Sequence, residues 1–390
     1  MSSPKKIILW RDSLLCSLLA VFFTLLFYLV VVNVNFLNPF EKILKDFRFT
    51  DIYHAQSLNE RKADRHIVLI NVQHHDRQAI AKAIDQVQVS QPKVVGIDLI
   101  FNQPKDPIKD SVLQATLGRY DNIVTAMYLE DGTRVENHPR FQHPQQQQGY
   151  ITLNESERDR VVRSFTGYAP QYQGLFSFAT QLCISAGKLD ETWAKQKLTQ
   201  PLAINYFGNE ASFLTFDLDE LHAQGNIPAL KDAIVIFGYL GTPTGNPNDI
   251  EDKHFTPLNK EYAGRSIPDM YGVLIHANII KMLSEKNYIL TLPFFVTAII
   301  AFVICFFTVM LGIVIYRKNN FRYYLIMKIK PLLVSLVLLF ITLVFYRINV
   351  HFYITPILVL TLMGLNMITL YRHLLIQLKP KISWKSYLLD

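Results

Sequence analysis

Cysteine is scarce in this sequence, and its placement excludes disulfide-stapled folds. Three cysteines occur in 390 residues; Cys16 and Cys305 lie in long apolar runs, which leaves Cys183 alone outside them. A single thiol cannot form an internal disulfide, so the chain is not a small secreted module held together by disulfides. The CxxC and HExxH spacings of zinc sites are also absent, and we expect no metal.

Catalytic motifs are lacking too. The sequence contains no G-x-S-x-G nucleophile elbow and no Walker A loop, and no histidine can be assigned to Cys183. The pair His74-His75 invites a metal interpretation. However, adjacent side chains point to different sides in most backbones, and a zinc site needs three or four converging ligands. We therefore expect neither an enzyme nor a cofactor.

Charge is missing from two long stretches. No charged residue occurs from Ser13 to Val34, about 22 residues, or from Thr291 to Tyr316, about 26 residues. About 20 apolar residues cross the hydrocarbon core of a bilayer as a helix. Residues 331–346 and 352–370 are shorter uncharged runs that suit a tight helical hairpin. The sequence thus predicts four transmembrane α-helices, at residues 13–34, 290–316, 331–346 and 352–370.

Positive charge flanks these apolar runs. Lysine and arginine, with hardly any acid, gather in residues 1–12, 317–330 and 371–390. By the positive-inside rule these segments face the cytoplasm, which puts both termini inside and residues 35–289 outside. The first run is too long for the apolar core of a typical signal peptide, and no small-x-small cleavage site follows it. We interpret this first run as an uncleaved signal anchor.

The net charge of +7 does not indicate a nucleic-acid-binding face. Thirteen of the 39 lysines and arginines lie in the terminal and membrane-flanking segments, which leaves 26 basic against 30 acidic residues in the outer segment. The excess positive charge therefore faces anionic lipid at the membrane. We expect the lipid bilayer, and no nucleic acid, among the partners.

The outer segment shows the pattern of an α/β domain. His66–Val72 is composed like a buried strand, Arg77–Val89 has apolar residues at helical spacing, and Lys93–Asp98 is a second apolar strand. Strand, helix and strand joined by short turns form a βαβ unit, so we predict a mostly parallel or mixed sheet. Residues 130–148 are expected to form a polar surface loop. Further helices are expected at 110–117, 175–187, 217–224 and 270–286, and further strands at 122–128, 202–206, 212–216 and 233–238.

Asp98 is the first candidate for a ligand site, because it ends the central predicted strand. In open α/β sheets, ligands bind outside the carboxyl ends of the strands. The alternative is a structural aspartate that caps the next turn or pairs with a basic residue. The loop GYLGTPTGNPND, which begins at Gly238, offers backbone amides for an anion nest or is a flexible surface loop. In the fourth apolar run, Asn366 is expected to face a neighbouring helix, because an amide is costly in lipid.

Five stretches together resemble a known family. They are Asp46-Phe47-Arg48-Phe49, PKVVGIDLIFNQP at 92–104, the segment 149–163, AIVIFGYLG at 233–241, and the segment 252–280, which contains GVLIHANII. In this order, over about 240 residues, they are similar to CHASE domains of the second type, the extracytoplasmic sensors of bacterial receptors. The family also resembles this chain in having one span before the domain and three after it.

The resemblance implies a multi-pass protein of the bacterial inner membrane with a periplasmic sensor domain. Two departures stand out. Asn71 and His74 occupy positions where the family usually has acidic residues, and about 20 residues follow the last predicted span, too few for a kinase or cyclase domain. For His276, the alternative to ligand binding is a half-buried helix position with a hydrogen-bonded ring. The ligand-binding residues that we expect are Asp98, Asn102, Gly241, Thr242, Asp252 and His276.

Three functions are compatible with these observations. We favour a membrane sensor or receptor subunit whose outer domain detects an unknown signal, a small molecule or a protein, and passes it to a separate cytoplasmic or membrane partner, with homodimerisation left open. The alternative is a structural envelope protein that docks other proteins; a large exposed apolar patch and no pocket would favour it. An anchored periplasmic enzyme built on Asp98 and Asp252 is the least favoured.

Overall fold

Two compact units make up the chain, Leu44–Ile289 and Met1–Ile43 with Leu290–Asp390. The predicted Asp46-Phe47-Arg48-Phe49 stretch and most of the predicted cytoplasmic loop at 317–330 lie outside the described residues. The computed structural model describes residues 3–33, 64–130, 133–157, 159–222, 225–259, 267–318, 329, 333–338, 340–342, 344–345, 347–351, 353–379 and 384–389.

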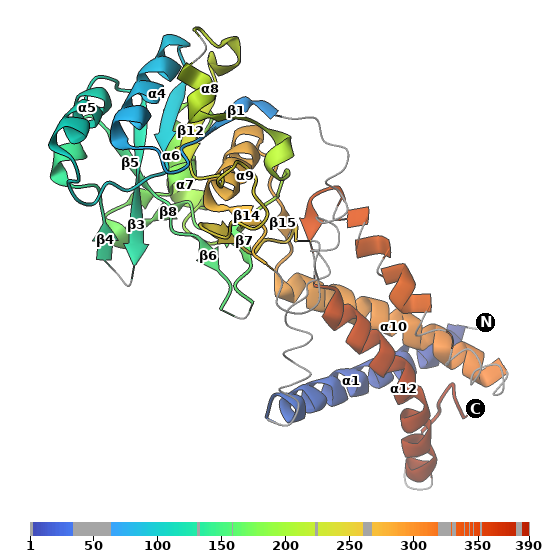
Figure 1. Ribbon diagram of the computed structural model, residues 1–390. Helices are drawn as coiled ribbons and strands as arrows, with labels where there is room; N and C mark the ends of the chain where they lie inside the picture. The colour runs from blue at the N-terminus through green and yellow to red at the C-terminus, as the bar shows by residue number, and fades with distance from the viewer. Residues whose placement is uncertain are drawn as a thin grey trace. The chain divides into compact units, whose positions relative to one another are not determined.

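A seven-stranded sheet forms the centre of the first unit. Its strands are β1 (Asp64–Asn71), β2 (Val94–Ile97), β3 (Ile123–Glu130), β4 (Thr133–Val135), β5 (Gln147–Tyr150), β11 (Phe213–Asp217) and β12 (Ile234–Gly238). They lie in the order β11-β1-β12-β2-β3-β4, and β5 also pairs with β3. Figure 1 labels β1, β12, β3, β4 and β5 of this sheet. Every pairing is parallel except that of β3 with β4. The prediction of a mostly parallel or mixed sheet is therefore confirmed.

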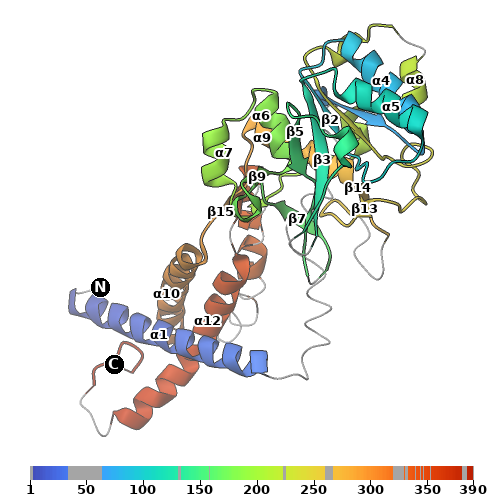
Figure 2. The same cartoon turned by 90° about the vertical axis from the view of Figure 1, so that its left-hand side faces the viewer.

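Helices cover both faces of this sheet. In β1, Ile67 and Leu69 belong to one apolar cluster, and Val68 and Ile70 belong to the other. A strand buried on both faces needs a continuous apolar run, which explains the composition of this segment. One face packs against α4 (Arg77–Val89), α5 (Pro107–Leu117) and α8 (Leu218–His222), and the other against α6 (Phe178–Ser185) and α9 (Gly272–Glu285) (Figure 2).

The central strand of the sheet comes from far along the chain. Segments β1, α4 and β2 form the expected βαβ unit, but β12 lies between its two strands. Its Ile236 is in register with Leu69 on one side and Gly96 on the other. A Cβ added to Gly96 would lie 2.7 Å from the ring of Phe178. Glycine at this position therefore allows α6 to pack closely against the sheet.

Several predicted elements differ at their ends. A short strand precedes each of two helices, so α6 and α9 begin later than the predicted 175 and 270. Helix α9 stops at Lys286, whose φ of 54° is left-handed, so it does not continue into the next helix. Residues 130–148 hold β4 and the start of β5 as well as loops.

Short elements complete the first unit. The other strands are β6 (Asn154–Glu155), β7 (Val162–Phe165), β8 (Tyr168–Ala169), β9 (Leu175–Phe176), β10 (Leu202–Ala203), β13 (Lys253–His254) and β14 (Met270–Tyr271). The other helices are α7 (Glu191–Lys197), η3 (Pro139–Phe141), η4 (Pro170–Tyr172), η5 (Glu210–Ser212) and η6 (Pro228–Leu230).

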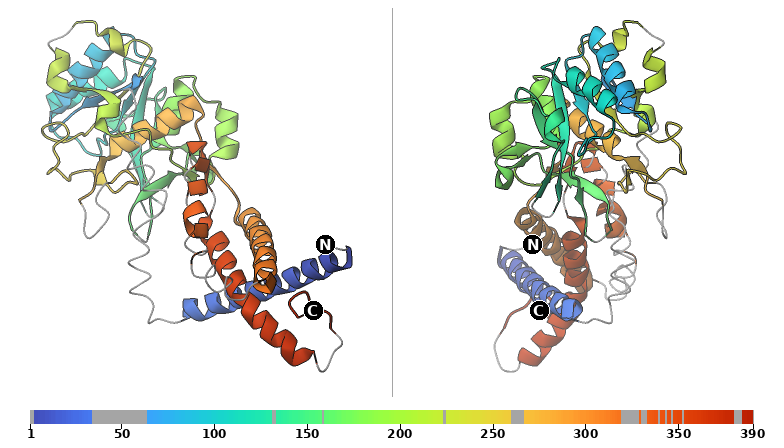
Figure 3. Two further views of the ribbon diagram at one scale, coloured as in Figure 1. Left: turned by 90° about the vertical axis from the view of Figure 1, so that its right-hand side faces the viewer. Right: turned by 60° about the vertical axis from the view of Figure 1, so that its left-hand side comes forward.

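Three apolar helices pack together in the second unit (Figure 3). They are α1 (Ser3–Asn33), α10 (Phe294–Lys318) and α12 (Ile354–Leu378), and each contains a stretch long and apolar enough to cross a membrane. The remaining predicted span, 331–346, is described only in part, and a short apolar helix lies there at Leu333–Thr342. Three of the four predicted spans are thus present as candidate membrane helices.

Small residues bring α10 and α12 close together. A Cβ added to Gly364 would lie 2.5 Å from Sγ of Cys305, so a larger residue would separate the helices. Two short strands just before these helices, β15 (Leu290–Thr291) and β16 (Val350–His351), pair in parallel. Both helices therefore begin at the same end of the unit.

The expectation for Asn366 is wrong. Its side chain is exposed on α12, and its Nδ2 donates a hydrogen bond of 3.1 Å to the carbonyl oxygen of Leu362, one turn earlier in the same helix. The amide is therefore satisfied in part within α12 itself.

Candidate functional site

The side chain of Asn71 joins the carboxyl ends of three strands. Its Nδ2 donates to the carbonyl oxygen of Gly241 at 2.9 Å and to Oγ1 of Thr244 at 2.6 Å. Its Oδ1 accepts from the backbone N–H of Leu240 at 2.9 Å. Asp217, at the end of β11, accepts hydrogen bonds from Thr244 Oγ1 and from Asn71. An aspartate at the start of the helix predicted at 217–224 is expected to cap that helix. In the structure, Asp217 instead holds the loop after β12.

This loop is anchored, and several of its amides already donate hydrogen bonds. The backbone N–H of Thr242 donates to a carboxylate oxygen of Asp249 at 3.0 Å, and that of Gly245 donates to Leu240 at 2.8 Å. The carboxylates of Asp217 and Asp249 would also repel an anion. These contacts weigh against both an anion nest and a freely flexible loop, and ligand binding by Gly241 and Thr242 stays a prediction.

Asp98 belongs to a cluster of titratable groups with Asp252 and His254. Asp98 as a whole residue is partly exposed, but its carboxyl group is buried. This burial, followed by the charge of Asp252, raises the pKa of Asp98 well above its usual value, against a smaller opposing effect of His254. Among the described residues, no side chain or backbone group donates a hydrogen bond to this carboxylate. Within the described ranges, Asp98 therefore shows neither of the structural roles, cap or ion pair, that the sequence offers as alternatives.

His254 lies between two carboxylates. Its Nδ1 is 3.0 Å from Oε1 of Glu155, and its Nε2 is 3.9 Å from Oδ1 of Asp252. Burial lowers the pKa of His254, but the hydrogen bonds and charges of Asp252 and Glu155 outweigh burial and raise it overall. The cluster can therefore take up protons and favours a positive charge at its centre.

Asp252 is fixed at the beginning of α9. Its φ of 56° is left-handed, and its carbonyl oxygen accepts a hydrogen bond of 3.0 Å from the backbone N–H of Gly272. A Cβ added to Gly272 would lie 3.1 Å from Oδ2 of Asp252. The carboxylate thus lies against the first turn of the helix, where the helix dipole favours negative charge. This contact accounts for the glycine at this end of the helix.

His276 is more deeply buried than the half-buried position that the sequence predicts. Its side chain is 4% exposed, and its ring centre is 5.6 Å from that of Phe178. The predicted hydrogen bond of the ring is present, to the backbone of Ile151, although Nδ1 has no hydrogen-bond partner among the described residues. Burial, with a smaller contribution from His254, lowers the pKa of His276 to about 3. The ring is therefore neutral at ordinary pH and packs in the core.

Asn102 lines a crevice of about 560 Å³ outside the ends of β1 and β2. Buried Arg77 forms one wall, where its guanidinium donates to Asp110 at 2.6 Å and lies 5.0 Å from the ring centre of Phe141. The crevice occupies the edge where open α/β sheets bind ligands, and its volume falls within the roughly 300–1,000 Å³ of small-molecule sites. Asn102 is thus separate from the Asp98 cluster, because none of Asp98, Asp252 and His254 lines this crevice.

The two neighbouring histidines of this crevice face different acids. Nε2 of His74 is 4.0 Å from Glu251, whereas Nε2 of His75 is 3.6 Å from Asp219. Within the described ranges, no group of three or more histidine, cysteine or acidic side chains is arranged to hold a metal ion. The groups along the crevice offer hydrogen bonds and charge to a ligand.

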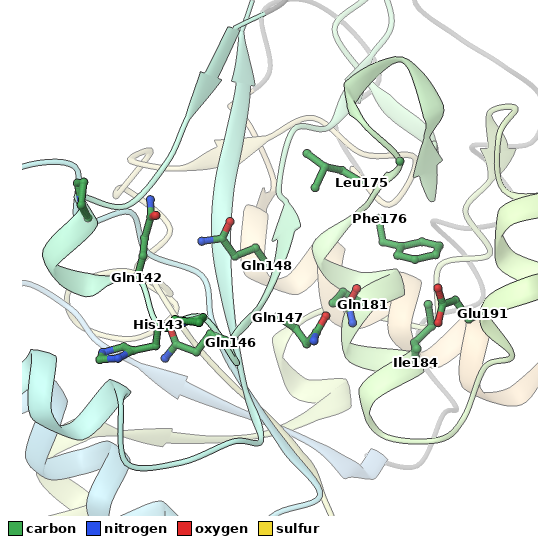
Figure 4. Close-up of a pocket in the computed structure, with 13 residues that line it drawn as sticks. Gln142, His143, Gln146, Gln147, Gln148, Leu175, Phe176, Gln181, Ile184 and Glu191 are labelled. Atoms are coloured by element: carbon green, nitrogen blue, oxygen red, sulfur yellow. The ribbon is translucent and has the colours of Figure 1, made fainter.

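A second cavity, of about 610 Å³, is lined by glutamines (Figure 4). Gln147 and Gln148 come from β5, whereas Gln181 comes from α6, and Phe176 closes one side. The amide groups of Gln147 and Gln148 have no hydrogen-bond partner within the described part of the chain. Sequence reasoning treats this glutamine run only as a polar loop. Its position directly before a strand is the signal that could have indicated a lining role.

These features define a membrane-anchored α/β domain with ligand-sized cavities at its sheet. A family model described as CHASE2 domain matches residues 21–314 of the chain. The chain therefore belongs to the CHASE2 family, and the resemblance stated from the sequence is confirmed. CHASE2 is an extracytoplasmic sensor domain. Comparisons with curated proteins and with solved structures found no match.

Proposed function

We propose that this chain is an integral membrane sensor whose CHASE2 domain detects a signal outside the cytoplasm and passes it to a separate partner protein. One observation carries the proposal. The family match begins inside α1 and ends inside α10, so the sensor domain and the helices on either side of it belong to one family unit. A ligand that binds two conformations of such a domain with different affinities shifts their populations. The helices α1 and α10 are then the covalent route for that shift.

The arrangement of the helices supports four spans. Strands β15 and β16 pair in parallel, so α10 and α12 start at the same end of the unit. At the other end, the hydroxyl of Tyr371, late in α12, donates a 3.3 Å hydrogen bond to Oδ1 of Asp12, early in α1. Two helices that cross a bilayer in the same direction require a return crossing between them, which supports a span at 331–346. With positive flanks inside, both termini are cytoplasmic, and residues 35–289 lie outside in the periplasm.

We place the signal at the carboxyl edge of the sheet, in the crevice beside Asn102. Its support is the position of the crevice, its volume and the mixture of charged and apolar groups along it. The alternative of a docking protein has less support. The most exposed apolar residues of the domain among those described are Val89 on α4, Ile108 on α5 and Ile250 in the loop after β12. Each comes from a different element, whereas a docking face is expected to be one contiguous patch.

The orientation can be tested by labelling single cysteines. The native thiols of Cys16, Cys183 and Cys305 are buried, so replacing them by alanine or serine leaves a clean background. We expect Gln103→Cys, in the crevice, to react with a membrane-impermeant maleimide in intact cells. We expect His373→Cys, exposed on α12, to react only after permeabilisation. The reverse pattern would contradict an outer sensor domain.

The partner can be sought by photo-crosslinking in native membranes. A photoreactive residue at His373 should capture a specific cytoplasmic or membrane protein, identified by mass spectrometry, whereas one at Gln103 should not capture the same protein. If neither position captures a specific protein, the proposal of a separate partner is wrong.

An enzymatic role would instead require that Asp98→Asn with Asp252→Asn abolish the cellular phenotype.

A further inference from the structure

A cavity of about 420 Å³ lies at the end of the membrane unit where α1 begins and α10 and α12 end. Four cationic side chains line it, from α1, α10, the end of α12 and the segment 384–389. Two of its other lining residues are Ile8 and Trp384, which supply an apolar side. The four cations are Lys5, Arg317, Lys379 and Lys385.

One wall of this cavity is held by a buried carboxylate. Asp12 is completely buried, and its Oδ2 accepts hydrogen bonds of 2.7 Å from Oγ of Ser386 and from the backbone N–H of Tyr387. Its Oδ1 accepts from the hydroxyl of Tyr371 at 3.3 Å. The segment 384–389 is therefore fixed against α1 and α12, and the cavity does not depend on a loose chain end.

Aromatic contacts fix the same wall. The guanidinium of Arg11 lies 4.2 Å from the ring centre of Trp384 and donates to the carbonyl oxygen of Lys385. The guanidinium of Arg317 lies 4.5 Å from the ring centre of Tyr387. Arg11 also forms an ion pair with Asp12, 3.0 Å from its Oδ1. Of the four cations that line the cavity, Arg317 is thus held in position by a cation–π contact.

Two of the four lysines and arginines, Lys5 and Lys385, favour a bound anion at this cavity. No acidic residue lines it within the described part of the chain, and neither Lys5 nor Lys385 forms an ion pair with a described acid. Like charges gathered around one small space repel each other, and a bound phosphate relieves that repulsion. Lysine binds phosphate as a point charge, and arginine adds paired N–H donors. Basic pockets between membrane helices bind the headgroups of anionic lipids for this reason.

We propose that this cavity binds a phosphate-bearing anion, and that its source is the headgroup of an anionic phospholipid. The position at the ends of membrane helices and the apolar side formed by Ile8 and Trp384 favour a lipid over free phosphate. This site is additional to the proposed sensing role. If the proposed orientation holds, the cavity lies at the cytoplasmic leaflet, and only this assignment rests on the proposed function. Bound lipid would then hold the ends of α1, α10 and the segment 384–389 together.

The test uses the full chain in nanodiscs or detergent, with native mass spectrometry to count retained lipids. We expect phosphatidylglycerol to be retained in preference to phosphatidylcholine. Removing a lysine near an anionic headgroup weakens binding about fivefold, so Lys5→Gln should lose about fivefold and Lys5→Gln with Lys385→Gln about 25-fold. The matched control is Lys6→Gln, because Lys6 is exposed on the same turn but does not line the cavity, and it should bind like wild type.

Two results would overturn the lipid site. One is equal retention of the two lipids, and the other is equal loss in Lys5→Gln and Lys6→Gln. If inorganic phosphate displaces bound phosphatidylglycerol at equal molarity, the phosphate chemistry is supported and the lipid source is wrong. Thermal unfolding in phosphatidylcholine checks that Lys5→Gln folds. The labelling at Gln103 and His373 does not involve these lysines, so failure of the sensor proposal would be seen separately.

Discussion

The side-chain amide of Asn71 donates a 2.9 Å hydrogen bond to the carbonyl oxygen of Gly241, 170 residues later in the chain. The same side chain accepts from Leu240, so one completely buried residue fixes both sides of the loop after β12. The family resemblance leads one to expect an acid at this strand end. An acid could not replace Asn71 here, because an ionised carboxylate has no N–H to donate.

Asn71→Asp is therefore expected to loosen the loop and destabilise the domain. The new carboxylate would lose the hydrogen bonds to Gly241 and Thr244. It would also lie beside the carboxylate of Asp217, because Nδ2 of Asn71 is 3.3 Å from Oδ1 of Asp217 in the native protein. Leaving buried groups unsatisfied costs about 1–3 kcal/mol, more where charge is involved. Thermal unfolding should show a fall of several degrees at pH 7. The control Asn248→Asp makes the same change at an exposed position of the loop and should leave the melting temperature unchanged. An equal fall in melting temperature for both variants would contradict the role of Asn71.

Asp98→Asn is expected to stabilise the domain at neutral pH. Burial and the charge of Asp252 raise the pKa of Asp98, so the folded state keeps its proton to higher pH than the unfolded state. Stability is therefore lost as the pH rises through the pKa that Asp98 has in the folded state. The uncharged amide of Asp98→Asn does not titrate, so the variant avoids this loss. The melting temperature of the variant should exceed that of wild type at pH 7 and equal it near pH 3. Exposed Asp121→Asn is the control, and a lower melting temperature of Asp98→Asn at pH 7 would contradict the prediction.

Asp269 should give a pH dependence in a defined window. Burial raises its pKa to about 6, although hydrogen bonds from Thr256 act in the opposite direction. Because the folded pKa exceeds the unfolded value of about 3.9, stability should fall as the pH rises from about 4 to 6 and then level off. Asp269→Asn can still accept from the backbone N–H of Thr256 and should flatten this part of the curve, as followed by thermal unfolding. A slope that persists unchanged in the variant would assign the titration to another group.

Gly149→Ala is expected to disrupt the contact between β5 and α6. A Cβ at this position would lie 2.5 Å from the backbone Cα of Phe178, which cannot move aside as a side chain can. Overpacking of this kind costs about 1–3 kcal/mol, so the melting temperature should fall by several degrees. Gly225→Ala is the control, because no atom lies within 4 Å of the added Cβ. Equal melting temperatures for the two variants would contradict this contact.

Local features of the fold could be predicted from the sequence. Helix α4 has the predicted bounds, Arg77–Val89, because Asp76 caps its first turn and the apolar spacing runs to its end. Strands β1, β2 and β12 were also predictable, since apolar runs of this kind suit strands buried on both faces. These signals lie within about ten residues of each other and need no knowledge of distant contacts.

Features that depend on distant contacts could not be predicted. The burial of His276 comes from its packing against Phe178 on α6, and the role of Asn71 comes from a loop 170 residues away. The glutamine cavity is formed by a strand and a helix that local patterns describe only separately. Asn366 shows the opposite case, because a hydrogen bond inside its own helix satisfies an amide for which the sequence suggests a distant partner.

The place of β12 between β1 and β2 sets the order in which the domain can form. Strands β1 and β2 are synthesised early, but both pair with β12, which lies between them. Neither can form this pairing until residues 234–238 have been made. Until then their unpaired edges and apolar faces are open to association with other chains. Pairing over such sequence separations is slow, because a long loop must close first. The sheet therefore assembles late, after most of the domain has been synthesised.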